Sequence, residues 1–320
     1  MFRQRLVSLL VAYLLDSAAG EPPPAAHPVV WVGRLLDLVE GLVRPRGRRA
    51  ELIPGFIGLG AAGLGSWVFA AYVQRGVNRL PGAAAILAEA MALKPAFAAR
   101  MLWAEALTVA ELLEVGDLSG ARRRVRSLVS RPTDGLPAPL VASAAVESVA
   151  ENLTDSIVAP TLAYLVAGLP GAYFYRVVNT ADARWGYRGR FEFFGKAAAR
   201  LDDLFNFVPA RLAAALLLAA GLIRGEDFPA GLKLWLRDGG RTASPNAGQT
   251  MSAMAGLLGV RLEKPGHYIL GKGLREPTPA DIRRAVRTAR AAGWALVVGL
   301  AGFGFMSGFI RGWRCRRRPF

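Results

Sequence analysis

Long stretches without a charged side chain restrict what this chain can fold into more than any other feature. Ile53 to Val73 is 21 residues without a charge, and Trp294 to Ile310 is a further 17. A helix of about 20 apolar residues crosses the roughly 30 Å hydrocarbon layer of a bilayer. The first stretch therefore predicts a transmembrane helix, and the second is close to the required length. With 53% hydrophobic residues and a mean hydropathy of +0.29, the sequence predicts an integral membrane protein.

Three other apolar or basic segments predict further helices. Leu6 to Leu15 is interpreted as a short membrane-embedded segment that stays on the protein, although the following Ser17-Ala-Ala19 could pass for a signal-peptidase site. Leu118 to Leu128 predicts a basic amphipathic helix at the surface or the membrane interface. Leu212 to Ile223 is apolar and is headed by Arg211, which we expect at an interface or against protein, because a charge at the bilayer centre costs about 2.5–3.5 kcal/mol.

The segment from Ile157 to Tyr175 is nearly long enough to span but is interrupted by Pro160 and by Gly168-Leu-Pro-Gly171. Such breaks are tolerated at membrane depth only where protein or a cavity shields the backbone. We predict a broken helix or re-entrant hairpin here, with a simple span as the alternative. No strand or hairpin pattern stands out, so the predicted fold is a single all-α, multi-pass membrane domain over residues 1–320.

The net charge of +16 does not indicate a nucleic-acid partner. The positive residues are spread over loops and over a basic C-terminal tail, the distribution expected of anchors on the cytoplasmic side of a membrane. A single cysteine, Cys315, excludes an intramolecular disulfide and a cysteine-based zinc cluster. The two histidines, His27 and His267, are too far apart in sequence to form a metal-ligand pair of their own.

One motif resembles a dinucleotide-binding loop but lies in the wrong context. Gly58-Leu-Gly60-Ala-Ala-Gly63 matches G-x-G-x-x-G. No strand precedes it, and no acidic residue lies near 20 positions downstream. Inside an apolar helix, small residues instead allow neighbouring helices to approach closely. We therefore interpret the motif as a packing surface.

The most informative polar pattern is a helical row of carboxylates. Glu147, Glu151 and Asp155 fall at i, i+4 and i+8, and the apolar segment that starts at Ile157 follows at once. Like charges at this spacing cost a helix roughly 0.2–0.5 kcal/mol per pair. The row predicts a cation nearby: Mg²⁺, an arginine or a substrate ammonium. A solvated acidic helix face is the alternative interpretation.

Further polar clusters follow along the chain, each of which by itself could be a turn or a cap. Asn179 and Asp182 share one helical face, and a Gly-Tyr turn ending at Tyr187 follows them. Arg200 precedes the adjacent carboxylates Asp202 and Asp203. The turn Ser244-Pro-Asn246-Ala-Gly248 offers side-chain and backbone donors for an anion or an amide. His27 lies in a proline-rich segment near the start of the chain.

Taken together and in order, these clusters resemble the CobD/CbiB family of cobalamin biosynthesis, the adenosylcobinamide-phosphate synthases. Five ordered blocks, spread over nearly the whole chain, carry the resemblance: Leu15-Asp-x-x-x-Gly20-Glu-Pro-Pro with His27-Pro-Val-Val-Trp31; Glu147-Ser-Val-Ala-Glu-Asn-Leu-Thr-Asp155; Asn179-Thr-x-Asp182-x-x-x-Gly-Tyr187; Ala199-Arg-Leu-Asp-Asp203; and Ser244-Pro-Asn-Ala-Gly248 with Ala253-Met-Ala-Gly256 and Gly259-Val-Arg-Leu262. The chain departs from the family pattern at Ser130-Arg131-Pro132-Thr133, Lys196 and Gln249.

The resemblance implies a multi-pass enzyme of the cell (inner) membrane. Such an enzyme joins aminopropanol or its O-phosphate to a propionate of adenosylcobyric acid, a cobalt corrinoid, through an ATP-dependent amide bond. Mg²⁺ is expected with ATP, because Mg²⁺ prefers carboxylate oxygens and water. The other expected partners are the lipid bilayer and other cobalamin-biosynthesis enzymes, with no nucleic acid.

The resemblance also suggests roles for residues. The expected catalytic residues are Glu147, Glu151, Asp155 and Asp182, one of which would take a proton from the amine. The expected metal ligands are Glu151, Asp155, Asp202 and Asp203. The expected substrate-binding residues are His27, Asn152, Asn179, Tyr187, Arg200, Ser244 and Asn246.

Two other functions are compatible with the residues. A membrane transporter of a small anionic or cobalt-containing solute would also use broken helices and intramembrane charges. The sequence shows no matching halves, however, and most polar clusters lie in predicted loops. The other alternative is a structural membrane partner of a separate enzyme.

Overall fold

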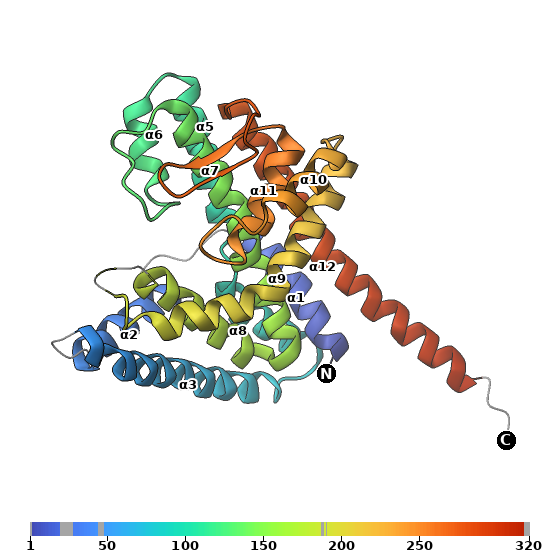
Figure 1. Ribbon diagram of the computed structural model, residues 1–320. Helices are drawn as coiled ribbons and strands as arrows, with labels where there is room; N and C mark the ends of the chain where they lie inside the picture. Colours follow the sequence, from blue (N-terminus) through green and yellow to red (C-terminus); the bar gives the residue numbers. More distant parts are fainter. Residues whose placement is uncertain (1, 20–27, 44–47, 187–188, 190, 317–320) are drawn as a thin grey trace.

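The fold, taken from a computed structural model, is almost entirely helical (Figure 1). The structure describes residues 2–19, 28–43, 48–186, 189 and 191–316. Within these residues the helices are α1 (Phe2–Ala19), α2 (Pro28–Val43), α3 (Leu52–Val77), α4 (Gly82–Leu93), α5 (Ala99–Glu114), α6 (Leu118–Val125), α7 (Ala138–Leu153), α8 (Ala159–Trp185), α9 (Lys196–Ile223), α10 (Phe228–Asp238), α11 (Ala247–Leu258) and α12 (Pro279–Arg316).

Three helical stretches are long and apolar enough to cross a membrane, judged by length and composition over the described residues. They are α3, the continuous stretch Ala138–Trp185 and α9. The bent pair Gly82–Ala96 and Ala99–Glu114, with an angle of 41°, would be a fourth. The predicted span at Trp294–Ile310 lies within α12, whose far end projects from the rest of the molecule (Figure 1). The all-α membrane fold is confirmed.

The stretch Ala138–Trp185 folds back on itself at Gly168. Gly168 has φ 69° and ψ −155°, a conformation that glycine adopts readily and other residues rarely do. In an unbroken helix, Asp155 and Arg176 would lie about 30 Å apart. Instead, Arg176 Nη1 donates to the carbonyl oxygen of Asp155 at 3.3 Å. The predicted break is therefore confirmed, and it returns the chain toward the acidic block.

The returning arm of α8 runs antiparallel to α3. The backbone N–H of Leu169 donates to Gln74, near the end of α3, at 3.2 Å. The ring of Phe174 packs against Gly63, so closely that a Cβ added to Gly63 would lie 2.6 Å from it. Gly58 and Gly63 are buried, whereas a Cβ on Gly60 would meet nothing within 4 Å. Within α3, the G-x-G-x-x-G motif is thus a helix-packing surface, as predicted.

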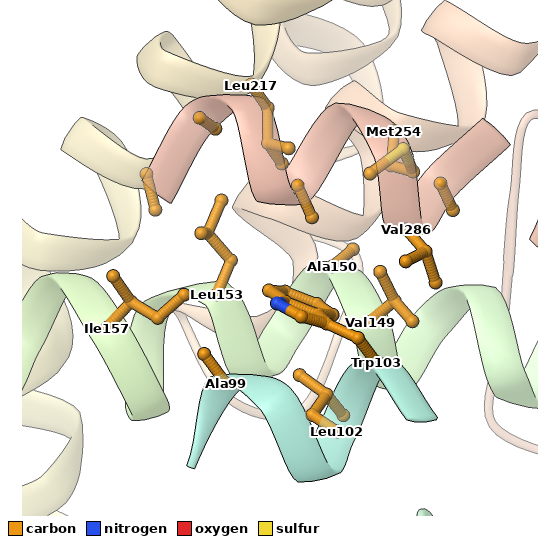
Figure 2. Packing of buried hydrophobic residues seen from close by; sticks show 14 of the residues in the cluster. Ala99, Leu102, Trp103, Val149, Ala150, Leu153, Ile157, Leu217, Met254 and Val286 are labelled. Atoms are coloured by element: carbon orange, nitrogen blue, oxygen red, sulfur yellow. The ribbon is translucent and has the colours of Figure 1, made fainter. Parts of the chain in front are cut away.

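The core lies where α5, α7, α9, α11 and α12 meet (Figure 2). Trp103 of α5 lies between Val149 and Leu153 of α7, and Val286 of α12 lies beside them. The small residues of α7, among them Ala142, Ala144, Ala145 and Ala150, are also buried, which lets the surrounding helices approach α7 closely. This packing holds α7, which carries Glu147 and Glu151, and the turn after it, which carries Asp155, in a fixed position.

The sequence prediction missed one element. The strands β1 (Leu262–Lys264) and β2 (Tyr268–Leu270) form a small antiparallel hairpin with Lys264 paired to Tyr268. Each strand has only three residues, too few to show an alternating pattern. The hairpin contacts α7 and α11. It matters because it places two polar side chains beside the acidic segment.

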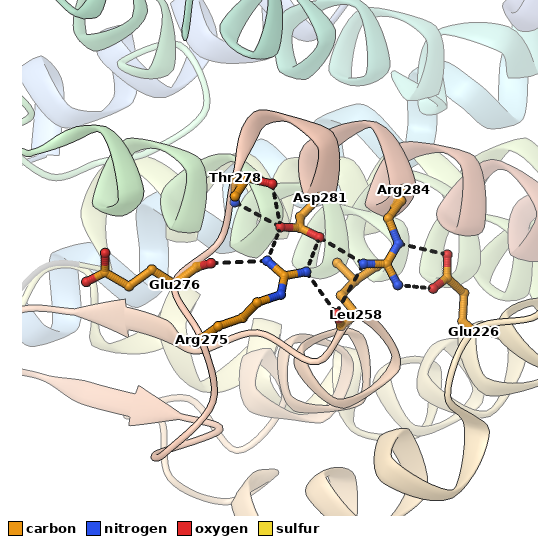
Figure 3. Close-up of polar contacts among 7 residues, drawn as sticks. All are labelled: Glu226, Leu258, Arg275, Glu276, Thr278, Asp281 and Arg284. Atoms are coloured by element: carbon orange, nitrogen blue, oxygen red, sulfur yellow. Dashed lines mark hydrogen bonds and ion pairs between the residues drawn. The ribbon is translucent and has the colours of Figure 1, made fainter. Parts of the chain in front are cut away.

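An ion-pair network around the buried carboxylate of Asp281 fastens the start of α12 to the preceding loop (Figure 3). The Asp281 side chain accepts two hydrogen bonds from Arg275, both 2.7 Å, and one from Arg284 at 2.9 Å. Thr278 adds its backbone N–H and its hydroxyl. Arg284 also pairs with Glu226, which precedes α10. The network therefore joins the loop before α12 and the first turns of α12 to the segment before α10.

Other expectations have mixed outcomes. The predicted basic amphipathic helix is confirmed as α6, shorter than Leu118–Leu128, with Ala121 and Val125 buried. Leu6 to Leu15 lies within the helix α1, where Leu6, Leu9 and Tyr13 are buried. Arg211 contacts protein: its guanidinium lies 3.6 Å from the centroid of the Phe207 ring.

Candidate functional site

A cavity of about 330 Å³ brings together acidic side chains from three segments of the chain. Glu151 and Asp155 come from the end of α7 and the turn after it, Asp182 from the end of α8, and Asp202 and Asp203 from the first turns of α9. The remaining described lining residues are Thr154, Gly186, Ala199, Asn206, Ala243, Ser244, Asn246 and Ala247. No lysine or arginine is among the described residues that line it. This acidic cavity therefore attracts cations.

The acidic segment owes its shape to a local change of helix type. Residues Thr154–Val158 form a single π-helical turn between α7 and α8. Such turns are rare and frequently occur at functional sites. The predicted row of three carboxylates is divided between two cavities: Asp155 lines the acidic cavity, Glu147 lines a smaller one, and Glu151 lines both.

Asn206 connects two of the carboxylates. Its Nδ2 donates to Asp155 Oδ1 at 3.1 Å and to Asp202 Oδ2 at 2.9 Å. Its Oδ1 accepts a hydrogen bond from the hydroxyl of Tyr175 at 2.9 Å. Asn179 Nδ2 donates to the other oxygen of Asp202 at 3.2 Å. Asp155 and Asp202 are thus held in place by hydrogen bonds from neutral amides, while the Arg176 guanidinium lies at the backbone oxygen of Asp155.

The Ser-Pro-Asn turn closes the cavity beside Asp203. Ser244 Oγ donates to Asp203 Oδ1 at 2.9 Å, and Asn246 Nδ2 donates to the backbone oxygen of Asp203 at 2.7 Å. Arg211 Nη1 in turn donates to Asn246 Oδ1 at 3.3 Å. The polar side chains of this turn therefore position Asp203 directly.

Glu151 and Asp182 differ from the other three acids. Their carboxylate oxygens form no hydrogen bond with any residue that the structure describes, although both line the cavity. Both carboxylate oxygens of Glu151 and of Asp182 are consequently free to accept a proton or bind a cation. Both belong to the predicted catalytic set.

Glu147 lies outside the acidic cavity and is fully engaged by its neighbours. It accepts hydrogen bonds from Ser143 Oγ at 2.6 Å and from the Tyr268 hydroxyl at 2.8 Å, and it pairs with Arg131 at 3.2 Å. Asn152 donates to the backbone oxygen of Ser148 at 3.0 Å and does not line the cavity. The structure therefore places both residues outside the acidic cavity.

The other predicted residues fall into two groups. Arg200 is exposed on α9 and does not line the acidic cavity. His27 and Tyr187 lie outside the described residues. Sequence reasoning overlooked Asn206, Tyr175 and Arg176 as site residues. Asn206 could have been found from its spacing, because it lies one helical turn after Asp202 and faces the same way.

The carboxylates of the acidic cavity would hold a divalent cation only together with ligands from a substrate or water. In the described residues, no three Asp, Glu, His or Cys side chains are grouped closely enough to hold a metal by themselves. The predicted ligands Glu151, Asp155, Asp202 and Asp203 therefore share a cavity without forming a closed cage. Mg²⁺ usually keeps several waters and is bound by one or two carboxylates plus substrate phosphates. An open cavity with several carboxylates suits that mode.

Fold and site together define a class: a helical membrane protein whose separate polar segments meet in one acidic cavity. Comparison with known families agrees with this class and narrows it to one family. The profile of the CobD/Cbib protein family matches residues 9–289. The chain belongs to the CobD/Cbib family, as its polar blocks predicted.

Curated relatives extend over nearly the whole chain. It is 39% identical to the cobalamin biosynthesis protein CobD of Dehalococcoides mccartyi, over 91% of this chain and 96% of that protein. It is 40% identical to the probable cobalamin biosynthesis protein CobD of Thermococcus kodakarensis, over 92% and 94%. The corresponding protein of Methanothermobacter thermautotrophicus is 39% identical, over 82% and 86%. No solved structure matches the chain.

Proposed function

We propose that this chain is a membrane enzyme of cobalamin biosynthesis that attaches aminopropanol, or its phosphate, to a propionate of adenosylcobyric acid. Family membership and the names of its relatives support the pathway. The observation that supports the chemistry is the acidic cavity, because an amine substrate arrives as a cation and has to lose a proton before it can attack a carbonyl. The cell (inner) membrane is the proposed location.

The cavity residues divide this work between them. Asp155 and Asp202, held by Asn206 and Asn179, provide fixed negative charge that orients the ammonium group. Glu151 and Asp182 have free oxygens, so one of them accepts the proton as the amine becomes nucleophilic. Asp203, oriented by Ser244, completes the ring of charge. Orientation of the reacting groups and removal of the proton are the two contributions of this chain's own side chains.

The carboxylate substrate is a poor electrophile, so the proposal includes ATP as a co-substrate and Mg²⁺ with it. ATP would supply the activation of the propionate, and Mg²⁺ would neutralise phosphate charge. Glu151, Asp155, Asp202 and Asp203 are the side chains that would hold the ion, through one or two of their oxygens at a time.

The test uses Glu151→Gln and Asp155→Asn in purified, detergent-solubilised protein. Each variant should lower the rate of cobinamide formation by about 100-fold or more, the range seen when a general base or an orienting charge is removed. Product is measured by mass spectrometry with adenosylcobyric acid, ATP and either amine. Formation of product in micelles also separates an enzyme from a transporter or a structural partner.

Two controls keep the result interpretable. Both substitutions remove a like charge from a crowded cavity, so the folded protein should be no less stable, and thermal unfolding checks this. Glu111→Gln changes an exposed carboxylate of α5 and should leave turnover unchanged. Normal turnover by both site variants would remove the acidic cavity from the mechanism.

A further inference from the structure

A second, smaller cavity of about 100 Å³ lies next to the acidic cavity, and Glu151 lines both. Its other described lining residues are Leu128, Val129, Ser130, Arg131, Glu147, Ser148, Lys264 and Tyr268. Three elements build it: the segment between α6 and α7, the helix α7, and the β-hairpin.

The hairpin register turns two polar side chains toward this cavity. Lys264 of β1 is paired directly with Tyr268 of β2. Side chains of directly opposed residues in an antiparallel pair lie on the same face. Both residues line the cavity, and the Tyr268 hydroxyl donates to Glu147 at 2.8 Å. The hairpin is therefore fixed against α7 with its lysine at the cavity wall.

The cavity has more hydrogen-bond donors than acceptors. Ser143, Tyr268 and Arg131 already occupy both oxygens of Glu147. Arg131 keeps donors beyond those that Glu147 takes, and its Nε has no hydrogen-bond partner among the described residues. Lys264 forms no hydrogen bond or ion pair with any residue that the structure describes, and its ammonium offers three more donors. These unused donors belong to two cationic side chains and suit a ligand that supplies acceptor oxygens, although Glu151 adds a negative charge to the same cavity wall.

We propose that this cavity is an anion subsite that binds a phosphate group, with Lys264 and Arg131 as its cationic ligands. The size limits the ligand: about 100 Å³ is roughly the volume of three water molecules, enough for a phosphate and far too small for a corrin or a nucleoside. Charge-assisted hydrogen bonds from lysine and arginine are the usual means of holding such a dianion.

The position of the subsite deepens the proposed function, on which its role in the reaction rests. Glu151 separates a cavity suited to an ammonium from a cavity suited to a phosphate. A molecule or a pair of co-substrates that carries both groups would extend across Glu151. Two sources are compatible with this chemistry, a phosphorylated amino alcohol and the phosphates of ATP.

The experiment substitutes Lys264, because removing it leaves no ion-pair partner behind. Binding of inorganic phosphate to the solubilised full-length protein is measured by calorimetry for the wild type, Lys264→Gln and Lys264→Arg. Loss of one charge-assisted contact should weaken phosphate binding roughly 10–100-fold in Lys264→Gln, and Lys264→Arg should restore it to within a few-fold. Lys272→Gln, an exposed lysine just after β2, should bind like the wild type.

Steady-state kinetics then identify the source of the phosphate. If the phosphorylated amine is the source, the Lys264→Gln variant should show a higher KM for aminopropanol phosphate and an unchanged KM for aminopropanol. If ATP is the source, the variant should show a higher KM for ATP. KM for adenosylcobyric acid should stay within about twofold of the wild type, because the subsite is too small for it.

Unchanged phosphate affinity in Lys264→Gln would overturn the proposal, and so would an equal loss in Lys272→Gln. The calorimetric measurement needs no turnover. A protein that binds phosphate through Lys264 but forms no cobinamide would therefore refute the proposed function and support the phosphate subsite. A protein that forms cobinamide but does not bind phosphate through Lys264 would refute the subsite and support the proposed function.

Discussion

Individual carboxylates in this protein behave differently because their neighbours differ. Asp281 is buried, and burial alone would raise its pKa, but hydrogen bonds from Arg275 and Thr278 outweigh that effect and lower the pKa from 3.8 to about 2. The acids of the acidic cavity instead accept hydrogen bonds from amides and a hydroxyl, and Arg176 donates to the backbone oxygen of Asp155, not to its carboxylate. The arginine-paired acid stabilises the fold, whereas the unpaired acids remain available for a ligand.

Asp281→Asn should destabilise the protein in a pH-dependent way. The folded pKa of about 2 lies below the unfolded value near 3.8, so the contribution of Asp281 is fully present above about pH 4 and is lost as the pH falls toward 2. Nearly two pKa units correspond to roughly 2 kcal/mol. The difference in unfolding free energy between wild type and variant should therefore be about that size at pH 7 and shrink below pH 4.

Denaturant unfolding in detergent at several pH values measures this difference. Asp134→Asn removes an acid from an exposed ion pair with Arg126 and should change stability by less than about 1 kcal/mol at any pH. A difference for Asp281→Asn that stays constant from pH 7 to pH 2 would contradict the assignment of the ion-pair network as its cause.

At the scale of elements, small residues decide how the helices fit together. A Cβ on Gly55 of α3 would lie 2.1 Å from the backbone oxygen of Phe194, in the segment that leads into α9. Backbone cannot move aside as a side chain can. The contact therefore fixes the start of α3 against the start of α9, and α9 carries Asp202 and Asp203. Glycine packing in a membrane helix thus contributes to the geometry of the site.

Gly55→Ala should destabilise the protein by about 1–3 kcal/mol, the typical cost of forcing an extra carbon into a packed contact. Gly60→Ala, five residues along the same helix, meets nothing within 4 Å and should be neutral or stabilising by up to about 1 kcal/mol, because alanine favours helix. Thermal unfolding of both variants in one detergent makes the comparison. Equal effects of the two substitutions would refute the packing argument.

At the scale of the whole molecule, the reversal at Gly168 decides where the site is. If each apolar block simply crossed the membrane, the acidic block and the Asn179 block would lie on opposite sides. The returning arm of α8 instead brings Asp182 into the cavity that Asp155 lines. The site thus depends on one irregular backbone position about 13 residues from the nearest acid.

Cysteine labelling tests this topology in intact cells and inverted vesicles. With Cys315 replaced by serine, Asn152→Cys, Ala183→Cys and Ala243→Cys should all react with a membrane-impermeant maleimide from the same side, because all three positions are at or beside the cavity. Arg79→Cys, beyond the other end of α3, should react from the opposite side. Asn152→Cys and Ala183→Cys reacting from opposite sides would contradict the fold-back.

Much of the fold could be predicted from residue patterns. The uncharged block at Ile53–Val73 became α3, the basic segment became α6, and Gly168-Leu-Pro-Gly171 marked the reversal. The hairpin β1–β2 could not be predicted, because three-residue strands carry no periodic signal and form only against α7 and α11. The spacing of Asn206 from Asp202 placed both on one helical face, but its hydrogen bond to Asp155, 51 residues away, could be found only from the tertiary structure.

By itself, the sequence determined that this is a helical membrane protein of the CobD/Cbib family, since hydrophobic block length and the order of polar blocks are properties of the chain alone. Only the tertiary structure decided which acids share a cavity. It left Glu147 and Arg200 outside the acidic cavity and brought Asp182, Asp202 and Asp203 together there with Glu151 and Asp155. The physical reason is that helical spacing fixes only which side chains share one face, whereas a cavity depends on how several faces meet.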